Sequence, residues 1–259
     1  MMEISVVKIG GNVIDNPEAL RCFVEKFAVR TGKKILIHGG GKVATSISTK
    51  LGIPTKIIDG RRITDWETVR VVTMVYAGLI NKTLVSQLQA LGCNALGLSG
   101  ADAGLIKAVK RNPKPIDFGY VGDVPVECVN AKQLLNFIDG ELVPVLCSIT
   151  ADKDGTLLNC NADTIAQSVA VALSQHHQVE LIYCFDKKGL LADVNDDNSA
   201  IPVINPENCA KLKADGVISD GMIPKIDNAF AALNAGVKKV VIKSYSDVDN
   251  DKGTIIKPD

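Results

Sequence analysis

Short apolar runs that end in glycine-rich turns alternate with amphipathic stretches in the N-terminal part of the chain. Residues 6–9 and 33–37 have the apolar character of buried strands, and the turns 10–12 and 38–42 follow them directly. Between the strands, residues 17–27 place apolar side chains about every 3.6 positions, which predicts a helix with one buried face. Because strand, turn and helix repeat in this order, we predict an α/β fold with a mainly parallel sheet.

Residues 55–64 interrupt this order with the pattern of a β-hairpin. Two short segments flank Asp59-Gly60, a dipeptide that favours a tight two-residue turn between antiparallel strands. Thr64 and Glu67 then have the spacing of a capping box, which predicts the start of a long helix that ends near Leu91.

The predicted helix 65–91 is apolar on all sides. Nine of the twelve residues from 69 to 80 are apolar, so a single buried face cannot hold them. The sheet can cover one side, and either a second subunit or the rest of one large lobe must cover the other. We expect a homodimer through helix 65–91, with burial inside a single lobe as the alternative.

The pattern of strands and helices continues to the end of the chain. Strands are predicted at 94–99, 105–109, 143–147, 180–185 and 240–242, and helices at 164–173 and 225–235. The polar stretch 175–178 precedes a new buried strand. We therefore predict two lobes, residues 1–177 and residues 178–259.

Composition excludes several classes of protein. The 259 residues carry a formal net charge of zero, so no overall field attracts nucleic acid or an anionic membrane. The seven cysteines form no CxxC pair and no zinc-ligand spacing, and we expect them to be thiols in a reducing compartment, with no metal site. Without a signal peptide or a run of 18 apolar residues, the chain is expected to be soluble and cytoplasmic.

Common catalytic motifs are missing from the sequence. It contains no GxxxxGK[ST] loop, no GxGxxG fingerprint, no GxSxG elbow, no HExxH pair and no protein-kinase catalytic loop. The three histidines offer little acid–base chemistry, because His38 follows a buried strand and is expected to pack or to bond the backbone.

Five charged residues stand instead at strand ends, in glycine-rich turns or at a helix start: Lys8, Arg62, Asp163, Asp186 and Lys225. The carboxyl ends of parallel strands meet at one edge of a sheet, where ligands bind. Two lysines there can neutralise a phosphoryl group in transfer, and a carboxylate can hold both lysines. The five residues together therefore favour phosphoryl transfer. The lack of an obvious general base fits an acceptor that is already a carboxylate, because no proton has to be removed from it.

An ordered set of motifs resembles the amino acid kinase family. The motifs are Lys8-Ile9-Gly10-Gly11, Ile37-His38-Gly39-Gly40-Gly41, Gly60-Arg61-Arg62-Ile63-Thr64, Asn159-Cys160-Asn161-Ala162-Asp163, Asp220-Gly221-Met222-Ile223-Pro224-Lys225 and Gly253-Thr254-Ile255. Together they extend over essentially the whole chain. The resemblance implies a three-layer αβα sandwich, with an acyl amino acid bound in the N-terminal lobe and ATP in the C-terminal lobe.

Within the family, the motifs are most similar to those of enzymes that phosphorylate the side-chain carboxylate of N-acetyl-L-glutamate in arginine biosynthesis. This similarity implies catalytic roles for Lys8, Lys225 and Asp163. It implies substrate binding by Gly40, Gly41, Arg62, Asn159 and Asn161. It implies ATP or phosphate binding by Lys8, Gly10, Gly11, Gly39, Asp186 and Lys225. Mg²⁺ would be held mainly by the nucleotide phosphates, the hairpin 55–64 would be a lid, and helix 65–91 would join two subunits.

The chain also departs from the family pattern. Arginine-inhibited members carry an extra N-terminal helix, and here the first strand begins near Met1, so the resemblance implies a dimer insensitive to arginine. Arg61 stands where the family commonly has an apolar residue. It either points to solvent from the hairpin or binds a further carboxylate, as in N-succinyl-L-glutamate. A non-catalytic ligand sensor on the same fold is a second alternative, although Lys8, Asp163 and Lys225 are all present.

Overall fold

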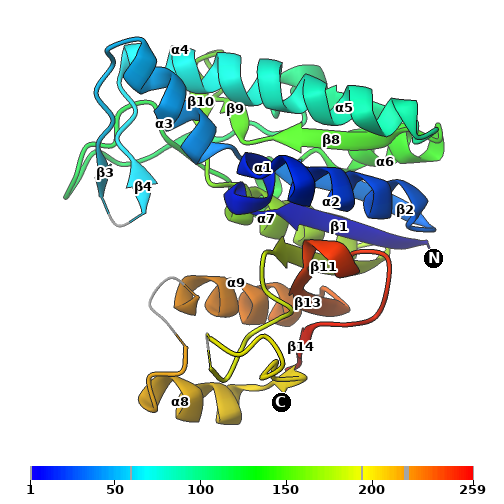
Figure 1. Ribbon diagram of the computed structural model, residues 1–259. Helices are drawn as coiled ribbons and strands as arrows, with labels where there is room; N and C mark the ends of the chain where they lie inside the picture. Colours follow the sequence, from blue (N-terminus) through cyan, green and yellow to red (C-terminus); the bar gives the residue numbers. More distant parts are fainter. Residues whose placement is uncertain (1, 59, 194, 219–221, 259) are drawn as a thin grey trace.

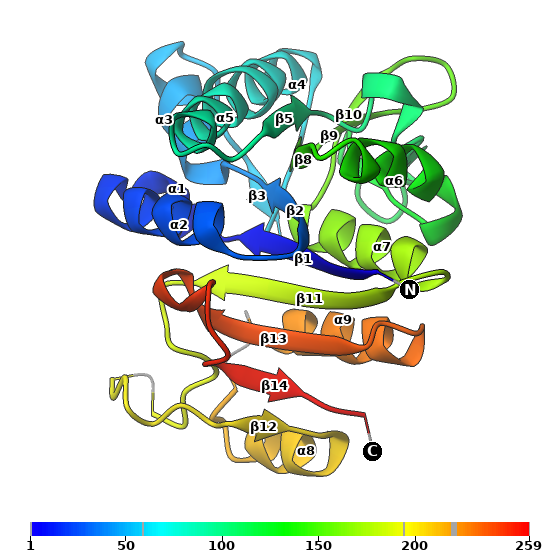
Figure 2. The ribbon, with the colours of Figure 1, turned by 90° about the vertical axis from the view of Figure 1, so that its right-hand side faces the viewer.

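The computed structural model describes residues 2–58, 60–193, 195–218 and 222–258, which form an α/β fold around one twisted sheet (Figures 1 and 2). In spatial order the strands are β12 (Val203–Ile204), β14 (Thr254–Ile256), β13 (Lys239–Ser244), β11 (Gln178–Phe185), β1 (Glu3–Ile9), β2 (Lys33–His38), β8 (Val143–Cys147) and β5 (Ala95–Leu98). Only the pairing of β13 with β14 is antiparallel within this described sheet. The predicted mainly parallel sheet is confirmed.

Helices cover both faces of the sheet and complete three layers. One face packs against α2 (Pro17–Val29), α4 (Trp66–Thr73) and α5 (Asn81–Ala90), and the other against α6 (Ala131–Asp139), α7 (Ala162–Ser174) and α9 (Ile223–Asn234). Successive residues of a strand point to opposite faces, so Val6 belongs to the α7 core and Val7 to the α2 core. The predicted αβα sandwich is confirmed.

Local sequence explains where α2 begins. The side chain of Asn16 accepts hydrogen bonds from the backbone N–H groups of Glu18 (3.0 Å) and Ala19 (3.1 Å), and Pro17 occupies the first turn, where it removes no helical hydrogen bond. Phe23, Val24 and Phe27 then form the buried stripe that the periodicity predicts.

Shorter elements connect the layers. They are α1 (Gly11–Asp15), α3 (Gly41–Lys50), β3 (Ile57–Ile58), β4 (Arg61–Arg62), η2 (Asp102–Gly104), β6 (Val109–Lys110), β7 (Gly122–Asp123), η3 (Val126–Cys128), β9 (Ile149–Ala151), β10 (Leu157–Asn159), α8 (Pro206–Ala214) and η4 (Tyr245–Asp247). Strands β3 and β4 pair antiparallel, as the hairpin pattern predicts, although Asp59 of the predicted turn lies outside the described residues. All seven cysteines are free.

The long helix differs from the prediction in two details. Its N-terminal cap is Asp65, whose side chain accepts from the Thr68 N–H at 2.8 Å, so the predicted capping box on Thr64 is wrong. A π-helical segment, η1 (Met74–Ile80), separates α4 from α5. By length and composition, Trp66–Ala90 is the one helix of the described chain able to cross a membrane, but core residues such as Val72 and Leu84 pack it against the sheet.

Two further predictions concern segments outside the long helix. The strand expected at 105–109 is wrong, because only its last residue, Val109, belongs to a strand, β6. The lobe boundary at residues 177 and 178 stays a prediction. The sheet is continuous across it, since β11 pairs with β1 from Gln178 to Cys184.

Candidate active site

Lys8, Asp163 and Lys225 come together at the carboxyl end of the central strands. Lys8 lies on the same face of β1 as Val6 and therefore points toward α7, where its Nζ is 2.6 Å from Oδ1 of Asp163. The Nζ atoms of Lys8 and Lys225 lie 5.5 and 5.1 Å from the centre of the Phe185 ring. Both ammonium groups thus face one cavity of about 220 Å³, which Lys8, Asp163, Phe185, Asp186 and Lys225 line.

Glycines shape the floor of this cavity. The Gly10 N–H donates to the Cys184 carbonyl at 2.9 Å, and a Cβ on Gly10 would lie 3.1 Å from the Phe185 ring. A Cβ on Gly11 would meet no atom within 4 Å. Because both residues line the cavity without side chains, their backbone is open to a bulky anion. We call this the phosphate cavity.

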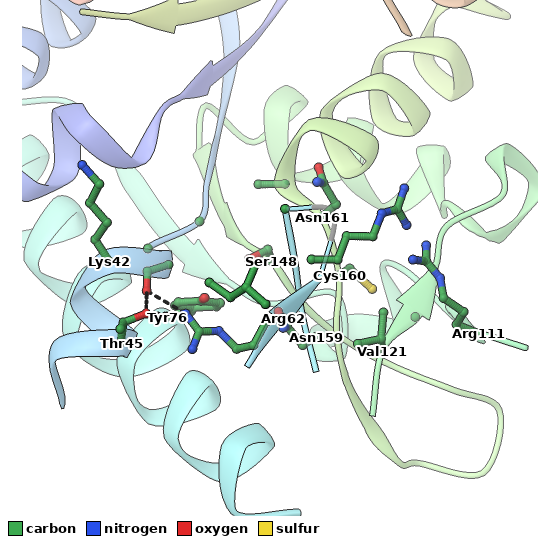
Figure 3. Close-up of a pocket in the computed structure, with 18 residues that line it drawn as sticks. Lys42, Thr45, Arg62, Tyr76, Arg111, Val121, Ser148, Asn159, Cys160 and Asn161 are labelled. Carbon is green, nitrogen blue, oxygen red and sulfur yellow. Dashed lines mark hydrogen bonds between the residues drawn. The ribbon is translucent and has the colours of Figure 1, made fainter. Parts of the chain in front are cut away.

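A second cavity of about 340 Å³ begins where the phosphate cavity ends. Ala162 lines the second cavity and its neighbour Asp163 lines the first, so the start of α7 separates them. Lys42 donates to Asn12 at 2.6 Å and links the two linings from the other side. Figure 3 shows Lys42, Thr45 and Tyr76 toward one side of this second cavity and Arg111 and Val121 toward the other. We call it the acceptor cavity.

The glycine turn after β2 lines the acceptor cavity. Gly39, Gly40 and Gly41 all belong to that lining, whereas Gly39, predicted to bind phosphate, is not among the residues that line the phosphate cavity. Gly40 has a φ of 155°, and a Cβ on it would lie 2.1 Å from Cδ1 of Ile80. Any other residue at this position would require at least the Ile80 side chain to shift.

Arg62 is buried at the edge of the acceptor cavity and held in one orientation. Its guanidinium donates to the hydroxyl of Thr55 (3.1 Å), the hydroxyl of Thr45 (2.8 Å) and the carbonyl of Gly41 (2.8 Å). These bonds hold the guanidinium at the edge of the cavity, where its positive charge suits a ligand carboxylate.

Asn159 and Asn161 also line the acceptor cavity, and each already uses one polar atom. The Asn159 amide donates to the Thr64 hydroxyl at 3.2 Å. The Asn161 carbonyl oxygen caps α7 by accepting from the N–H groups of Asp163 (2.8 Å) and Thr164 (3.1 Å). Within the described chain, the Asn159 side-chain oxygen and the Asn161 side-chain NH₂ group make no hydrogen bond, and they are the polar atoms available to a ligand.

Sequence reasoning missed several residues of the acceptor cavity, namely Thr45, Tyr76, Arg111 and Ser148. Thr45 lies one helical turn after Gly41, so helical spacing could have found it. Arg111 follows the short strand β6 and pairs with Asp123 through an ion pair, and no motif marks it. Beyond the phosphate cavity, apolar residues including Leu190, Leu191 and Met222 line a third cavity of about 270 Å³ that shares Asp186 and Lys225.

His38 is a structural residue beside this turn. Its Nδ1 lies 2.9 Å from the Gly39 carbonyl, and Asn81 donates to its Nε2 at 3.1 Å. Complete burial lowers the pKa of His38 to about 4, so the imidazole is neutral, with its proton on Nδ1. The packing role predicted for His38 is confirmed.

We expect His38 to make the protein less stable in mild acid. Between pH 6.5 and pH 4 the unfolded chain binds a proton at His38 that the folded chain does not, so stability falls as pH is lowered. The full loss from this residue is about 3 kcal/mol. Urea unfolding of wild type and His38→Gln at pH 7 and pH 4.5 measures the difference, and the exposed variant His176→Gln is the control. An equal loss of stability in wild type and His38→Gln would contradict the assignment.

The described side chains around these cavities do not form a complete metal-binding site. Among the described residues, no group of three or more His, Cys, Asp or Glu side chains is placed to hold a metal ion. In the phosphate cavity the carboxylates are Asp163, which pairs with Lys8, and Asp186, which accepts from the Asn12 amide at 3.3 Å. A metal here must take most of its ligands from a bound molecule.

A parallel sheet with two lysines and glycine turns at one edge suits phosphoryl transfer, and the chain belongs to the amino acid kinase family. The sequence model of that family matches residues 3–244. The chain is 50% identical over 259 residues to an acetylglutamate kinase from Cytophaga hutchinsonii, covering 98% of this chain and 97% of the relative. It is 50% identical over 255 residues to an acetylglutamate kinase from Bacteroides thetaiotaomicron, covering 98% of each chain.

Solved structures share the same fold. The smu.665 protein from Streptococcus mutans superposes with a TM-score of 0.80 at 28% identity, covering 98% of each chain. N-acetylglutamate synthase from Neisseria gonorrhoeae superposes with a TM-score of 0.76 at 19% identity, covering 98% of this chain and 59% of that one. The second likeness is a likeness of fold alone.

Proposed function

We propose that the protein uses ATP to phosphorylate the side-chain carboxylate of N-acetyl-L-glutamate, which is a step of arginine biosynthesis. The observation that carries this proposal is the junction of the two cavities. Lys8 and Lys225 face the phosphate cavity, and the acceptor cavity with Arg62 begins one residue before Asp163. Relatives about 50% identical over nearly the whole chain carry the name acetylglutamate kinase, which supports the same activity.

In this proposal each cavity holds one substrate. The apolar third cavity binds the nucleoside, and the phosphate cavity binds the phosphates against Gly10 and Gly11. The γ-carboxylate of the acceptor lies near Gly39, Gly40 and Gly41, and its α-carboxylate pairs with the positive charge of the Arg62 guanidinium. The remaining polar atoms of Asn159 and Asn161 are available to the amide of the acyl group.

The chemistry follows from charge. A carboxylate oxygen of the acceptor attacks the γ-phosphorus of ATP, an acyl phosphate forms, and ADP leaves, so no proton has to be removed. Lys8 and Lys225 neutralise the charge on the phosphoryl oxygens during transfer. Asp163 acts as a positioning residue because its ion pair fixes the Lys8 ammonium.

Mg²⁺ is proposed to arrive with the nucleotide. The pairing of Asp163 with Lys8 leaves Asp186 as the other carboxylate among the described residues of the phosphate cavity, which fits a metal held mainly by phosphate oxygens. When bound, the metal would neutralise part of the charge on the phosphate oxygens, and Asp186 is the side chain of this cavity that would help to hold it.

The assembly and location are part of the same proposal. Large apolar side chains of the long helix are exposed, with Trp66 at 57%, Met74 at 58% and Leu79 at 54%. We infer a cytoplasmic homodimer that covers them, in which residues 1–177 and 178–259 act as the acceptor and ATP lobes. Sedimentation equilibrium measures the mass in solution, and a purely monomeric protein would contradict the dimer.

Trapping the product tests the proposed reaction. Hydroxylamine converts an acyl phosphate to a hydroxamate, so the enzyme with ATP, Mg²⁺ and N-acetyl-L-glutamate should give a hydroxamate in step with ADP. N-acetyl-L-aspartate is the matched control, because it is one methylene shorter and should leave its carboxylate short of the phosphate. ATP binding without turnover of any acylated glutamate would support a ligand sensor and contradict the proposed activity.

A further inference from the structure

Arg61 is a charged residue of the acceptor cavity that the proposed reaction leaves without a role. Strand geometry turns adjacent side chains of β4 to opposite sides, so Arg62 is buried against Gly41 and Thr45 while Arg61 is exposed. Arg61 nevertheless lines the acceptor cavity. Within the described chain it has no hydrogen bond or ion pair, and its side chain is both exposed, as the solvent-facing alternative expects, and part of the cavity lining.

The surroundings of Arg61 are positively charged. Partial burial lowers the pKa of Arg61, and the positive charge of Arg111, which lines the same cavity, lowers it further. Asp123 raises the pKa of Arg61, but its carboxylate is already paired with Arg111. One carboxylate for two guanidinium groups leaves an excess positive charge at this side of the cavity.

The position of this charge corresponds to one part of the acceptor. An N-acylated glutamate has three polar ends: the reacting γ-carboxylate, the α-carboxylate and the acyl group. The first belongs near the glycine turn and the phosphate cavity, and the second belongs at Arg62. The acyl group is left for the side of the cavity that Arg111 and Val121 occupy in Figure 3.

We propose that Arg61 recognises a carboxylate at the end of the acyl group, so that the preferred acceptor is an N-acylglutamate with a dicarboxylic acyl chain, such as N-succinyl-L-glutamate. This inference rests on the proposed function. A guanidinium suits the role because it presents a planar fork of donors to a carboxylate. A cavity of about 340 Å³ lies in the range of small-molecule sites and leaves room for the longer acyl chain.

Three acceptors separate charge from size. N-acetyl-L-glutamate has the short neutral acyl group, N-butanoyl-L-glutamate has the four-carbon chain without charge, and N-succinyl-L-glutamate has the same chain length with a carboxylate. We expect kcat/KM for the succinyl compound to exceed that for the butanoyl compound by about tenfold or more, the size of a charge-assisted hydrogen bond. The expected difference lies mainly in KM.

Arg61→Gln tests the residue itself. The variant should lower the succinyl-to-butanoyl ratio of kcat/KM about tenfold, and Arg61→Glu should lower it further. Arg70→Gln, which changes an exposed arginine on α4, is the matched control and should keep the wild-type ratio. Thermal melting of each variant checks that it folds.

The outcomes separate this inference from the proposed function. Turnover of the acetyl or butanoyl compound without a preference for the succinyl compound would overturn the role of Arg61 and leave the kinase activity standing. A preference that survives Arg61→Gln would also overturn it. Turnover of none of the three acceptors would overturn both proposals.

Discussion

Replacing Lys8 with methionine should lower kcat about 10²–10³-fold, the usual cost of removing one preorganised charge from a transition state. Methionine keeps an unbranched side chain of similar size but removes the ammonium group, which lies over the Phe185 ring and faces the phosphate cavity. KM for the acceptor should change little, because the acceptor cavity is lined by other residues. Initial rates of ADP release at varied acceptor concentration measure both constants.

Loss of the Lys8 charge also affects folding, and a second variant separates the two effects. Lys8 and Asp163 are 9% and 16% exposed as side chains, so Lys8→Met leaves a mostly buried carboxylate without its partner. Removing one member of a buried pair costs about 3–5 kcal/mol. The double variant Lys8→Met/Asp163→Asn should regain much of this stability and remain inactive. A double variant as active as wild type would show that Lys8 serves the fold and not the transfer of the phosphoryl group.

The sequence predicts the phosphate cavity well for a topological reason. Lys8 and Asp186 are far apart in the chain, but β1 and β11 are parallel neighbours whose carboxyl ends meet at one sheet edge. Any charged residue directly after such a strand must reach that edge. Lys225 follows no strand, and the sequence points to it through its place near a helix start and through the resemblance to the family, not through periodicity.

The acceptor cavity is less predictable because long-range contacts build it. Arg111 follows a strand of only two residues, β6, which pairs with β7 across a loop and has no apolar alternation. Residues 105–109 are apolar enough for a strand, yet Leu105 and Ile106 pack into the α7 core from irregular backbone. The π-helical segment is also absent from the pattern, because hydrophobic spacing does not distinguish it from an α-helix that is apolar all round.

The second large predicted effect is a loss of stability at the glycine turn after β2, which the π-helical segment η1 contacts. Gly40→Ala should destabilise the protein by about 3 kcal/mol, because the new Cβ meets Ile80 at 2.1 Å and the Tyr76 ring at 3.1 Å. A φ of 155° is also unfavourable for any residue with a Cβ, so alanine adds backbone strain. For a chain of this size the melting temperature should fall by roughly 10 °C. KM for the acceptor should rise as well, since Gly40 and Tyr76 line its cavity.

Two other glycines separate the sources of this loss. Gly41→Ala places a Cβ with no atom within 4 Å and without a positive φ, so it should leave the melting temperature unchanged or slightly higher. Gly52→Ala has a φ of 70° and the same open surroundings, so it measures backbone strain alone, about 1 kcal/mol. If Gly40→Ala and Gly52→Ala have the same melting temperature, the contact with Ile80 does not contribute to the loss of stability. If Gly40→Ala melts well below Gly52→Ala, the contacts with Ile80 and Tyr76, together with the strain of a φ of 155°, account for the loss, and the shape of the acceptor cavity depends on a glycine at this turn.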